Sequence, residues 1–322
     1  MTAQSDSPSV QPSNAVLLGI DCGGSHTAVV VGDRQGRVMT RAEGPGSAMR
    51  PGGAARSAAV IQDVARRAAA QAKISLPASV ALVGAAGAGR APEQKELADA
   101  LTAAGVAERV DVRSDIEIAL AAAFGENPGI LINAGTGSIA YARTEDGRFH
   151  RAGGYGWQLG DEGGGYWLGR RALAAAARAN DGLEESSTLL ERLLVALGLR
   201  TFDDLIRWTA TATPAQVAAL APHVLNAARE GETVAQRIVA DGAVELSQLV
   251  KVLTGQFSGA EPIKMATTGG LLRPGSPLLA ALRLGLAQDL PRARLSESGS
   301  SVDAPVGALR LAAKLLGKNS PG

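Results

Sequence analysis

Short apolar runs that end in glycine-rich turns predict a strand-rich start to the chain. The run Val16–Ile20 is followed by an acidic residue and a glycine pair, which is typical of a buried strand that closes in a turn. The run Ala28–Val31 predicts the return strand of a hairpin, and residues 37–42 predict a third strand. Helix, strand, helix, strand and helix are expected to follow up to Phe124, beginning with an amphipathic stretch at residues 54–72.

The opening pattern of strand, glycine-rich turn and strand returns in the second half of the chain. Gly129–Asn133 predicts a strand, Asn133–Ser138 a turn, and Ile139–Arg143 the returning strand. A further strand is expected at Ile263–Ala266, with the turn Thr267–Gly270 after it. Such a repeated pattern predicts an α/β protein of two related lobes with a ligand cleft between them. The helices expected in this half lie at about residues 165–178, 184–197, 201–210, 214–229, 232–254 and 276–288.

Composition and charge narrow the function classes without selecting one. The 322 residues are 46% hydrophobic and 20% charged, as in ordinary globular proteins. The net charge of +1 gives no overall basic field, so we expect no nucleic-acid partner and no membrane partner. Three His and one Cys leave little for a zinc cluster and nothing for an internal disulfide. The polar residues 1–14, which lack a signal-peptide core, predict a disordered tail on a cytoplasmic enzyme.

Three glycine-rich turns that follow strands are the main chemical signal. They are Asp21–Thr27, Asn133–Ser138 and Thr267–Gly270. Glycines let backbone N–H groups face a bound anion, and Ser and Thr hydroxyls add donors. Two such turns that face each other fit a polyphosphate, and Asp21 in the first turn suits Mg²⁺. A single glycine pair after a strand is usually a structural hairpin, so the ordered set of three carries the prediction. The chain has no P-loop, no G-x-G-x-x-G and no G-x-S-x-G motif.

These turns match a known set of motifs. The segments Gly19-Ile20-Asp21-x-Gly23-Gly24-Ser25-x-Thr27, Asn133–Ser138 and Thr268-Gly269-Gly270 resemble the two phosphate motifs and the adenosine motif of the sugar kinase/actin/Hsp70 superfamily. The segment Gly153–Gly163, which reads GGYGWQLGDEG, is similar to the signature of N-acetylglucosamine kinases within the BadF/BadG/BcrA/BcrD ATPase family. The resemblance covers about residues 15–316.

The resemblance implies a fold, an activity and cofactors. It implies two actin-like (ribonuclease H-like) lobes, each a mixed five-stranded sheet with helices. We expect the N-terminal lobe over residues 15–124, joined by a C-terminal helix at 303–316, and the C-terminal lobe over residues 125–302. The implied activity is ATP-dependent phosphorylation of a sugar hydroxyl, usually O6 of an N-acetylhexosamine, with ATP and Mg²⁺ as cofactors. Dimers are common in the family, which makes a homodimer an open alternative to a monomer.

The resemblance also implies a general base. Asp115 matches the family Asp that takes the hydroxyl proton, because it follows a strand, opens a helix and precedes the second phosphate motif. The structural alternative is that Asp115 only caps its helix, as Ser-Asp pairs often do. One residue can do both, and the resemblance favours the base.

Sugar binding is implied for the second turn and for the Gly-Asp-Glu-Gly segment. Asp161 matches a family residue that binds sugar hydroxyls, and a carboxylate can accept from two adjacent hydroxyls. Glu162 either assists or is a solvated residue at the start of the next helix, and Trp157 either packs against the sugar or fills the core. The remaining residues expected to bind substrate are Thr136, Gly137, Ser138 and Gly156.

ATP binding is implied for all three turns. The residues expected to contact the nucleotide are Gly23, Gly24, Ser25, Thr27, Gly135, Thr136, Gly269 and Gly270. Gly269 and Gly270 are expected to border the adenosine, while Asp21 is expected to bind Mg²⁺, through water.

Two departures from the family pattern bear on the substrate. Cys22 stands where the family often has Gly, which is a small change. More important, the loop Gly44–Arg50 lacks the Asn that usually contacts the sugar, and the chain has no Asn between residues 15 and 126. The missing amide leaves glucosamine, a muramic-acid derivative and other hexoses open as acceptors.

Two rival functions are considered within the same resemblance. ATPases of this family that activate dehydratases hold a [4Fe–4S] cluster between two subunits, which needs two Cys from each chain. This chain has only Cys22, so that function is disfavoured. A regulator that binds nucleotide or sugar without chemistry stays open, although Asp115 and the Gly-Asp-Glu-Gly segment argue against it.

Overall fold

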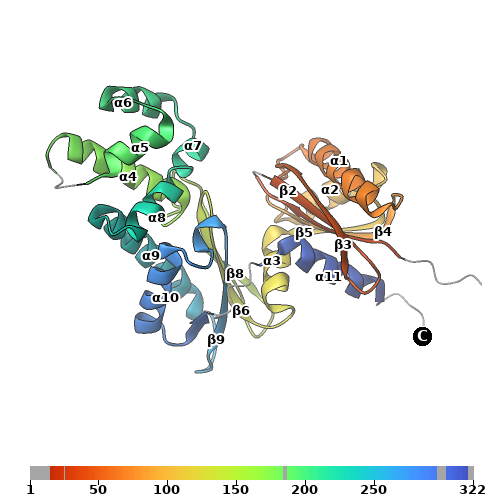
Figure 1. Ribbon diagram of the computed structural model, residues 1–322. Helices are drawn as coiled ribbons and strands as arrows, with labels where there is room; N and C mark the ends of the chain where they lie inside the picture. The colour runs from red at the N-terminus through yellow and green to blue at the C-terminus, as the bar shows by residue number, and fades with distance from the viewer. Residues whose placement is uncertain (1–14, 25, 184–186, 296–301, 318–322) are drawn as a thin grey trace, which may run out of the picture. The chain divides into compact units, whose positions relative to one another are not determined.

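The computed structural model describes residues 15–24, 26–183, 187–295 and 302–317. The tail expected at residues 1–14 and the predicted site residue Ser25 lie outside these described residues. The chain divides into two compact units, with boundaries between Gly125 and Glu126 and between Val302 and Asp303. Each unit is described below by itself (Figure 1).

The first unit is built on a mixed five-stranded sheet in the order β3-β2-β1-β4-β5. Its strands are β1 (Leu17–Cys22), β2 (His26–Gly32), β3 (Val38–Pro45), β4 (Ala78–Ala85) and β5 (Ala107–Ser114). β2 runs antiparallel to both β1 and β3, whereas β1, β4 and β5 run parallel. The first three strands therefore form a meander, and the parallel strands are joined through helices.

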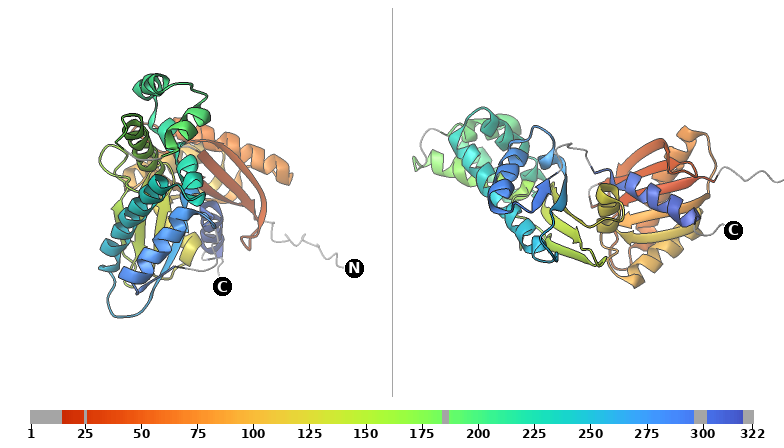
Figure 2. Two further views of the ribbon diagram at one scale, coloured as in Figure 1. Left: turned by 60° about the vertical axis from the view of Figure 1, so that its left-hand side comes forward. Right: turned by 90° about the horizontal axis from the view of Figure 1, so that it is seen from below.

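Helices cover both faces of the first sheet because neighbouring strand residues point to opposite sides. The helices are α1 (Ala54–Ala72), α2 (Ala91–Ala103), α3 (Asp115–Phe124) and α11 (Ala304–Gly317). Leu18 and Ile20 face a core shared with α1 and α2, whereas Leu17 faces a second core shared with α3 and α11. Figure 2 shows α3 and α11 side by side in two further views.

Close packing of α11 depends on two glycines. A side chain at Gly19 on β1 would collide with the Pro305 carbonyl and with Leu309 of α11. A side chain at Gly307 would collide with the Ile118 carbonyl of α3. The C-terminal helix is therefore held directly against the first sheet, although the whole second unit separates the two in sequence.

The second unit repeats the sheet and adds more helices. Its sheet has the order β10-β9-β6-β7-β8, with β6 antiparallel to β7 and parallel to β9. The strands are β6 (Gly129–Ala134), β7 (Ser138–Arg143), β8 (Phe149–Gly153), β9 (Ile263–Thr268) and β10 (Ala293–Leu295). The helices are α4 (Gly165–Asn180), α5 (Leu189–Leu197), α6 (Phe202–Thr211), α7 (Pro214–Ala218), α8 (Ala221–Arg229), α9 (Thr233–Thr254) and α10 (Pro277–Asp289). One continuous core joins Ile130 and Ile132 of the sheet to Leu246 and Val250 of α9.

The predicted α/β fold with two mixed five-stranded sheets is confirmed, and two details are wrong. The single helix expected at residues 214–229 is two helices, α7 and α8. Pro222 has no N–H for the Ala218 carbonyl, so a new helix begins at Ala221 instead. The strand β10 was not expected, because three residues are too few for a periodic signal.

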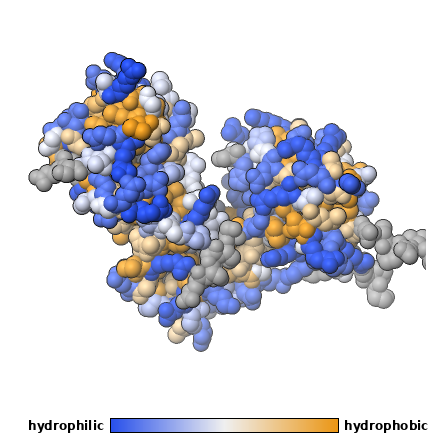
Figure 3. Space-filling view, in the orientation of Figure 1, coloured by the Kyte–Doolittle hydropathy of each residue, from blue (hydrophilic) through white to orange (hydrophobic). Residues whose placement is uncertain are grey.

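The surface of the described residues is mixed. Figure 3 shows hydrophilic residues in blue around smaller hydrophobic areas in orange on one face. Large apolar side chains that reach solvent include Val195 on α5 and Ile206 on α6. Within the described part of the chain, no helix has the length and apolar character needed to cross a membrane.

Candidate functional site

The parallel strands of the first unit bring three segments, two of them predicted site segments, to one edge of the sheet. Cys22 pairs in register with Ala85, and Ala85 pairs with Ser114. The glycine turn after β1, the loop after β4 and Asp115 after β5 therefore follow at the same carboxyl edge. Ligands of open α/β sheets bind at this edge.

The first glycine turn is held by a buried hydroxyl network. The Gly23 N–H donates to the His26 carbonyl at 2.9 Å, which closes the turn. The Thr27 hydroxyl donates to the Pro45 carbonyl at 2.7 Å and lies 2.6 Å from the Ser47 hydroxyl. Thr27 has no exposed surface. Thr27 therefore supports the turn from behind, while Gly24 faces open space.

The loop that follows β3 is tied to the same turn. The N–H groups of Ser47 and Ala48 both donate to the Gly23 carbonyl at 3.1 Å. The Met49 N–H donates to the Ala86 carbonyl at 2.8 Å, and the Met49 side chain is buried in the core. This loop, which lacks the expected Asn, is thus fixed to two of the three segments at the sheet edge.

Asp21 is a partly buried carboxylate without a hydrogen-bond or ion-pair partner among the described residues. Burial raises the pKa of Asp21 from 3.8 to about 6. His26 and Arg41 oppose this increase, while the carboxylates of Asp115 and Asp303 add to it. A divalent cation satisfies such a carboxylate, so this residue fits the predicted Mg²⁺. Within the described ranges no three His, Cys, Asp or Glu side chains converge on one metal position, so waters and a ligand would supply the other oxygens.

Asp115 is distinct from the helix cap beside it. Ser114 is the N-cap of α3, and Ser114 and Glu117 form a reciprocal capping box. Asp115 is the first helical residue, and its carboxylate accepts from the Ile116 N–H at 3.0 Å. Burial raises the pKa of Asp115 above its usual value of 3.8, and the backbone hydrogen bonds oppose the increase. Since Ser114 and Glu117 form the capping box, capping alone does not explain this partly buried acid.

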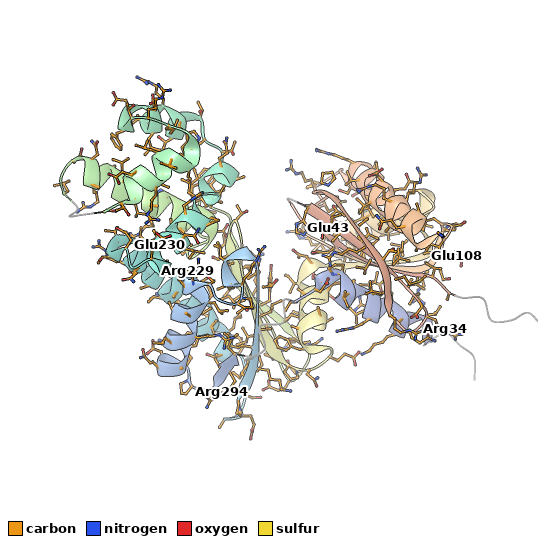
Figure 4. All side chains as sticks on the ribbon, in the orientation of Figure 1. Arg34, Glu43, Glu108, Arg229, Glu230 and Arg294 are labelled. Atoms are coloured by element: carbon orange, nitrogen blue, oxygen red, sulfur yellow. The ribbon has the colours of Figure 1, made fainter. Side chains whose placement is uncertain are left out.

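An ion pair near Asp21 was not found from the sequence. Arg41 on β3 donates to Asp303, which precedes α11, at 2.9 Å, and to Glu43 at 3.0 Å. Figure 4 labels Glu43. Arg41 and Asp303 both act electrostatically on Asp21. The 262 positions between Arg41 and Asp303 leave no local pattern that could have predicted the pair.

The second glycine turn lies at the corresponding edge of the second sheet. The Gly135 N–H donates to the Gly137 carbonyl at 2.9 Å and closes the turn between β6 and β7. No hydrogen bond within the described residues takes the N–H groups of Thr136 and Gly137. These two amides are therefore available to an anion.

Asp161 lies directly against this turn. It has a positive φ of 66°, which is uncommon for a residue other than glycine. Its carboxylate accepts backbone hydrogen bonds from Gly156 and Ser138. Burial raises the pKa of Asp161, these hydrogen bonds lower it, and the Glu162 charge raises it. A Cβ at Gly137 would overlap the Asp161 carboxylate, which would then have to move away from the turn.

Hydrogen bonds join the Gly-Asp-Glu-Gly segment to the turn. The buried Ser138 hydroxyl donates to the Glu162 carbonyl at 2.6 Å. The Gly165 N–H donates to the Gly135 carbonyl at 2.8 Å, and the Tyr166 N–H donates to the Thr136 carbonyl at 2.9 Å. The start of α4 and the glycine turn are thus one rigid assembly, and the Ser138 hydroxyl serves it as a structural group.

The third turn packs against the second. Thr268 at the end of β9 pairs in register with Asn133 of the parallel strand β6. Gly269 has a φ of 92° and lies so close to the Ala134 carbonyl and the Asn133 side chain that no Cβ would fit. Gly270 opens the short 3₁₀ helix η1 (Gly270–Leu272). The structure therefore brings the predicted adenosine turn beside the predicted phosphate turn.

The aromatic residue of the signature segment is at the surface. Trp157 is 45% exposed, and its ring lies 5.0 Å from the Tyr166 ring between centroids. This exposure argues against a core-filling role. Glu162 is also exposed, and together with Trp157 it lines a pocket on the second unit.

Comparisons with known proteins agree with this geometry. The model of the BadF/BadG/BcrA/BcrD ATPase family matches residues 18–312. An N-acetylmuramic acid/N-acetylglucosamine kinase from Clostridium acetobutylicum is 30% identical, over 87% of this chain and 92% of that protein. An N-acetyl-D-glucosamine kinase from Dictyostelium discoideum is 26% identical, over 93% of this chain and 98% of that protein. The crystal structure of a proposed N-acetylglucosamine kinase from Chromobacterium violaceum has a TM-score of 0.76 and 31% identity, and covers 94% of this chain and 100% of that one.

Proposed function

The chain belongs to the BadF/BadG/BcrA/BcrD ATPase family, and from that membership we propose that it is an ATP-dependent kinase that phosphorylates O6 of an N-acetylated amino sugar. The two curated relatives and the similar crystal structure all have the names of kinases of N-acetylated amino sugars. In the reaction, a bond forms between the sugar oxygen and the γ-phosphorus of ATP, and the bond from that phosphorus to the β-phosphate oxygen breaks. ADP leaves, and the hydroxyl proton passes to the protein.

The observation that carries the proposal is the raised pKa of the Asp115 carboxyl group at the edge of the first sheet. A general base must be ionised near neutral pH and yet hold a proton well enough to remove one. The raised pKa of Asp115, caused by burial, moves the group in that direction. Ser114 and Glu117 form the capping box of α3, and the Asp115 carboxylate, which accepts from the Ile116 N–H, keeps acceptor capacity for the hydroxyl proton.

Binding of the two substrates is assigned to the three glycine turns and Asp161. The free amides of Thr136 and Gly137 would bind phosphate oxygens, and Gly24 would do the same from the first turn. Gly269 and Gly270 would border the adenosine. Asp161 accepts two backbone hydrogen bonds, which leaves part of its acceptor capacity for sugar hydroxyls.

Mg²⁺ is assigned to Asp21. The cation, when bound, would neutralise phosphate charge and orient the phosphates for in-line transfer. Arg41 and Asp303 would set the local charge around Asp21, since both act on it electrostatically.

The relatives and the loop after β3 both bear on the substrate class. Both curated relatives are kinases of N-acetylated amino sugars, which favours this substrate class here. The loop Gly44–Arg50 has no Asn, so a hydrogen bond that the family pattern would provide must come from elsewhere. Selectivity among amino sugars is therefore expected to differ from that of family members with the Asn.

The direct test of the base is Asp115→Asn. This variant keeps the shape of the side chain and cannot take a proton, so turnover should fall by about 10²–10⁴-fold, as for loss of a general base. Sugar and ATP affinities, measured by calorimetry, should stay within about threefold because no binding group is removed. Asp99→Asn, which changes an exposed Asp on α2, is the matched control and should keep full turnover. Near-normal turnover in Asp115→Asn would show that another group is the base.

A further inference from the structure

A pocket on the second unit lies directly beside the proposed sugar ligand Asp161. Its volume is ≈ 510 Å³, within the range of about 300–1,000 Å³ that is typical of small-molecule sites. Gly160 and Glu162, the neighbours of Asp161 in sequence, both line it. The proposed phosphorylation reaction gives no role to most of this pocket.

The consecutive acidic residues Asp161 and Glu162 have side chains in different surroundings. The Asp161 carboxylate binds the backbone of the second glycine turn, at Ser138 and Gly156. The Glu162 side chain is exposed and lines the pocket. The positive φ of Asp161 lets adjacent side chains leave the chain in these different directions. The wall of the pocket nevertheless begins one residue to either side of Asp161, at Gly160 and Glu162, so the pocket is adjacent in the chain to a ligand that Asp161 would hold.

Three polar side chains in the pocket have no partner among the described residues. Gln158, Glu162 and Arg170 line it, and none of their side chains makes a hydrogen bond or an ion pair with any described residue. The neighbouring Arg171, in contrast, pairs with Asp241 and lies over the Trp167 ring at 5.2 Å. The pocket thus contains a donor in Arg170, an acceptor in Glu162, and both in Gln158.

Aromatic rings form the rest of the wall. Trp157, Tyr166 and Trp167 line the pocket, and the first two rings contact each other at 5.0 Å with an interplanar angle of 53°. Trp157 keeps 45% of its surface exposed. A wall with both aromatic rings and polar side chains favours a ligand that has both apolar faces and polar edges.

We propose that this pocket is a second saccharide subsite, which holds a neutral sugar ring linked to the amino sugar that is phosphorylated. The inference rests on the proposed function and extends its substrate class from monosaccharides to disaccharides. A pyranose ring has C–H faces that can pack on Trp157 and Trp167. Its hydroxyls can accept from Arg170 and donate to Glu162.

The balance of charge in the pocket favours a neutral ring over a charged group. An anionic substituent would pair with Arg170 but would be repelled by Glu162. Hydroxyls, each both a donor and an acceptor, satisfy Arg170, Glu162 and Gln158 together. The subsite is therefore matched to a glycosyl unit.

The test compares N,N′-diacetylchitobiose with N-acetylglucosamine as acceptors, by kcat/KM, in the full-length protein. We expect the disaccharide to be phosphorylated at least as efficiently as the monosaccharide. The ratio of kcat/KM for the disaccharide to kcat/KM for the monosaccharide should fall by about tenfold in Arg170→Ala and in Gln158→Ala, as for loss of a hydrogen bond in a binding site. Arg207→Ala, an exposed arginine on α6, is the control and should leave the ratio unchanged.

Tryptophan emission gives a second readout that does not depend on turnover. Two of the three Trp residues line the pocket, and Trp208 lies on α6. The disaccharide should therefore change the emission more than the monosaccharide does, and the change should persist in Trp208→Phe. Arg170→Ala should weaken this response to the disaccharide.

The outcomes separate the inference from the proposed function. If the monosaccharide is phosphorylated while the disaccharide neither reacts nor changes Trp emission, the subsite is refuted and the kinase function stands. If the disaccharide binds and neither sugar reacts, the subsite stands and the kinase function fails. If N-acetylmuramic acid alone depends on Arg170, the pocket takes a carboxylate and the inference is wrong. If neither sugar binds or reacts, both proposals fail.

Discussion

The partly buried Asp21 gives a stability prediction whose size follows from its pKa. Burial raises that pKa from 3.8 to about 6, so the folded state holds the proton more tightly than the unfolded state does. The contribution of Asp21 to stability is therefore greatest below about pH 4 and is lost as the pH rises through about 6. At about pH 8 the ionised group should cost about 3 kcal/mol of folding free energy, and at about pH 4.5 about 1 kcal/mol.

Asp21→Asn removes this charge with little change of shape. We expect the free energy of unfolding to rise by about 3 kcal/mol at about pH 8 and by only about 1 kcal/mol at about pH 4.5. The same variant should lose Mg²⁺-dependent turnover, because it lacks the carboxylate that is proposed to bind the cation. The wild-type protein thus keeps a functional carboxylate at the expense of stability.

Urea unfolding followed by far-ultraviolet circular dichroism, with a chelator present, measures the change in the free energy of unfolding at each of the two pH values. All three Trp and all three Tyr residues lie in the second unit, so their emission separately reports the unit that the substitution leaves unchanged. Asp99→Asn, at an exposed position on α2, should change stability by less than about 0.5 kcal/mol at either pH. A loss of stability in Asp21→Asn at about pH 8, or an equal gain at both pH values, would refute the reasoning.

Three further predictions follow from single contacts. The acid limb of kcat should lie above pH 3.8, since Asp115 must be ionised to act as a base and burial raises its pKa; a pH–rate profile measures it. Thr27→Val should lower the free energy of unfolding by about 1–3 kcal/mol in urea titrations, because the Pro45 carbonyl and the buried Ser47 hydroxyl lose a partner. Gly137→Ala should lower kcat/KM for the sugar by about 10–100-fold in steady-state assays, because its methyl group displaces the Asp161 carboxylate.

Each of these predictions has a control and a contrary result. An acid limb at or below pH 3.8 would argue against a buried base. Thr102→Val removes an exposed hydroxyl on α2 and should hardly change the free energy of unfolding. If Thr27→Val changes it no more than this control does, the buried network does not stabilise the fold. Gly89→Ala adds a methyl group to open space and should keep full activity. Unchanged sugar kinetics in Gly137→Ala would remove Asp161 from the acceptor site.

The sequence predicts those parts of the fold that local pattern controls. The run Val16–Ile20 with its glycine turn, and the matching run at Gly129–Asn133, are strands in the structure because short apolar segments closed by Gly are strong local signals. The break at Pro222 was missed because the apolar stripe continues across it. The strand β10 was missed because only pairing with β9 defines it.

The candidate site was predictable as motifs and not as contacts. Thr27 was expected at the phosphates, whereas its hydroxyl is buried against the loop after β3. No local sequence pattern predicts this network or the pair of Arg41 and Asp303, because the partners come together only in the folded chain. The pocket of Arg170 and Trp157 likewise joins two segments whose polar side chains have no sequence motif in common.

The central claim, an ATP-dependent kinase of an amino sugar, is tested most directly by ADP release against an acceptor panel. The panel contains N-acetylglucosamine, glucosamine, N-acetylmuramic acid, N-acetylmannosamine, glucose and no sugar, and nuclear magnetic resonance locates the phosphate on each product. We predict that at least one N-acetylated amino sugar stimulates ADP release, in equal amounts with a product phosphorylated at O6. ADP release that is the same with every sugar as without one, in protein that still binds ATP, would contradict the account.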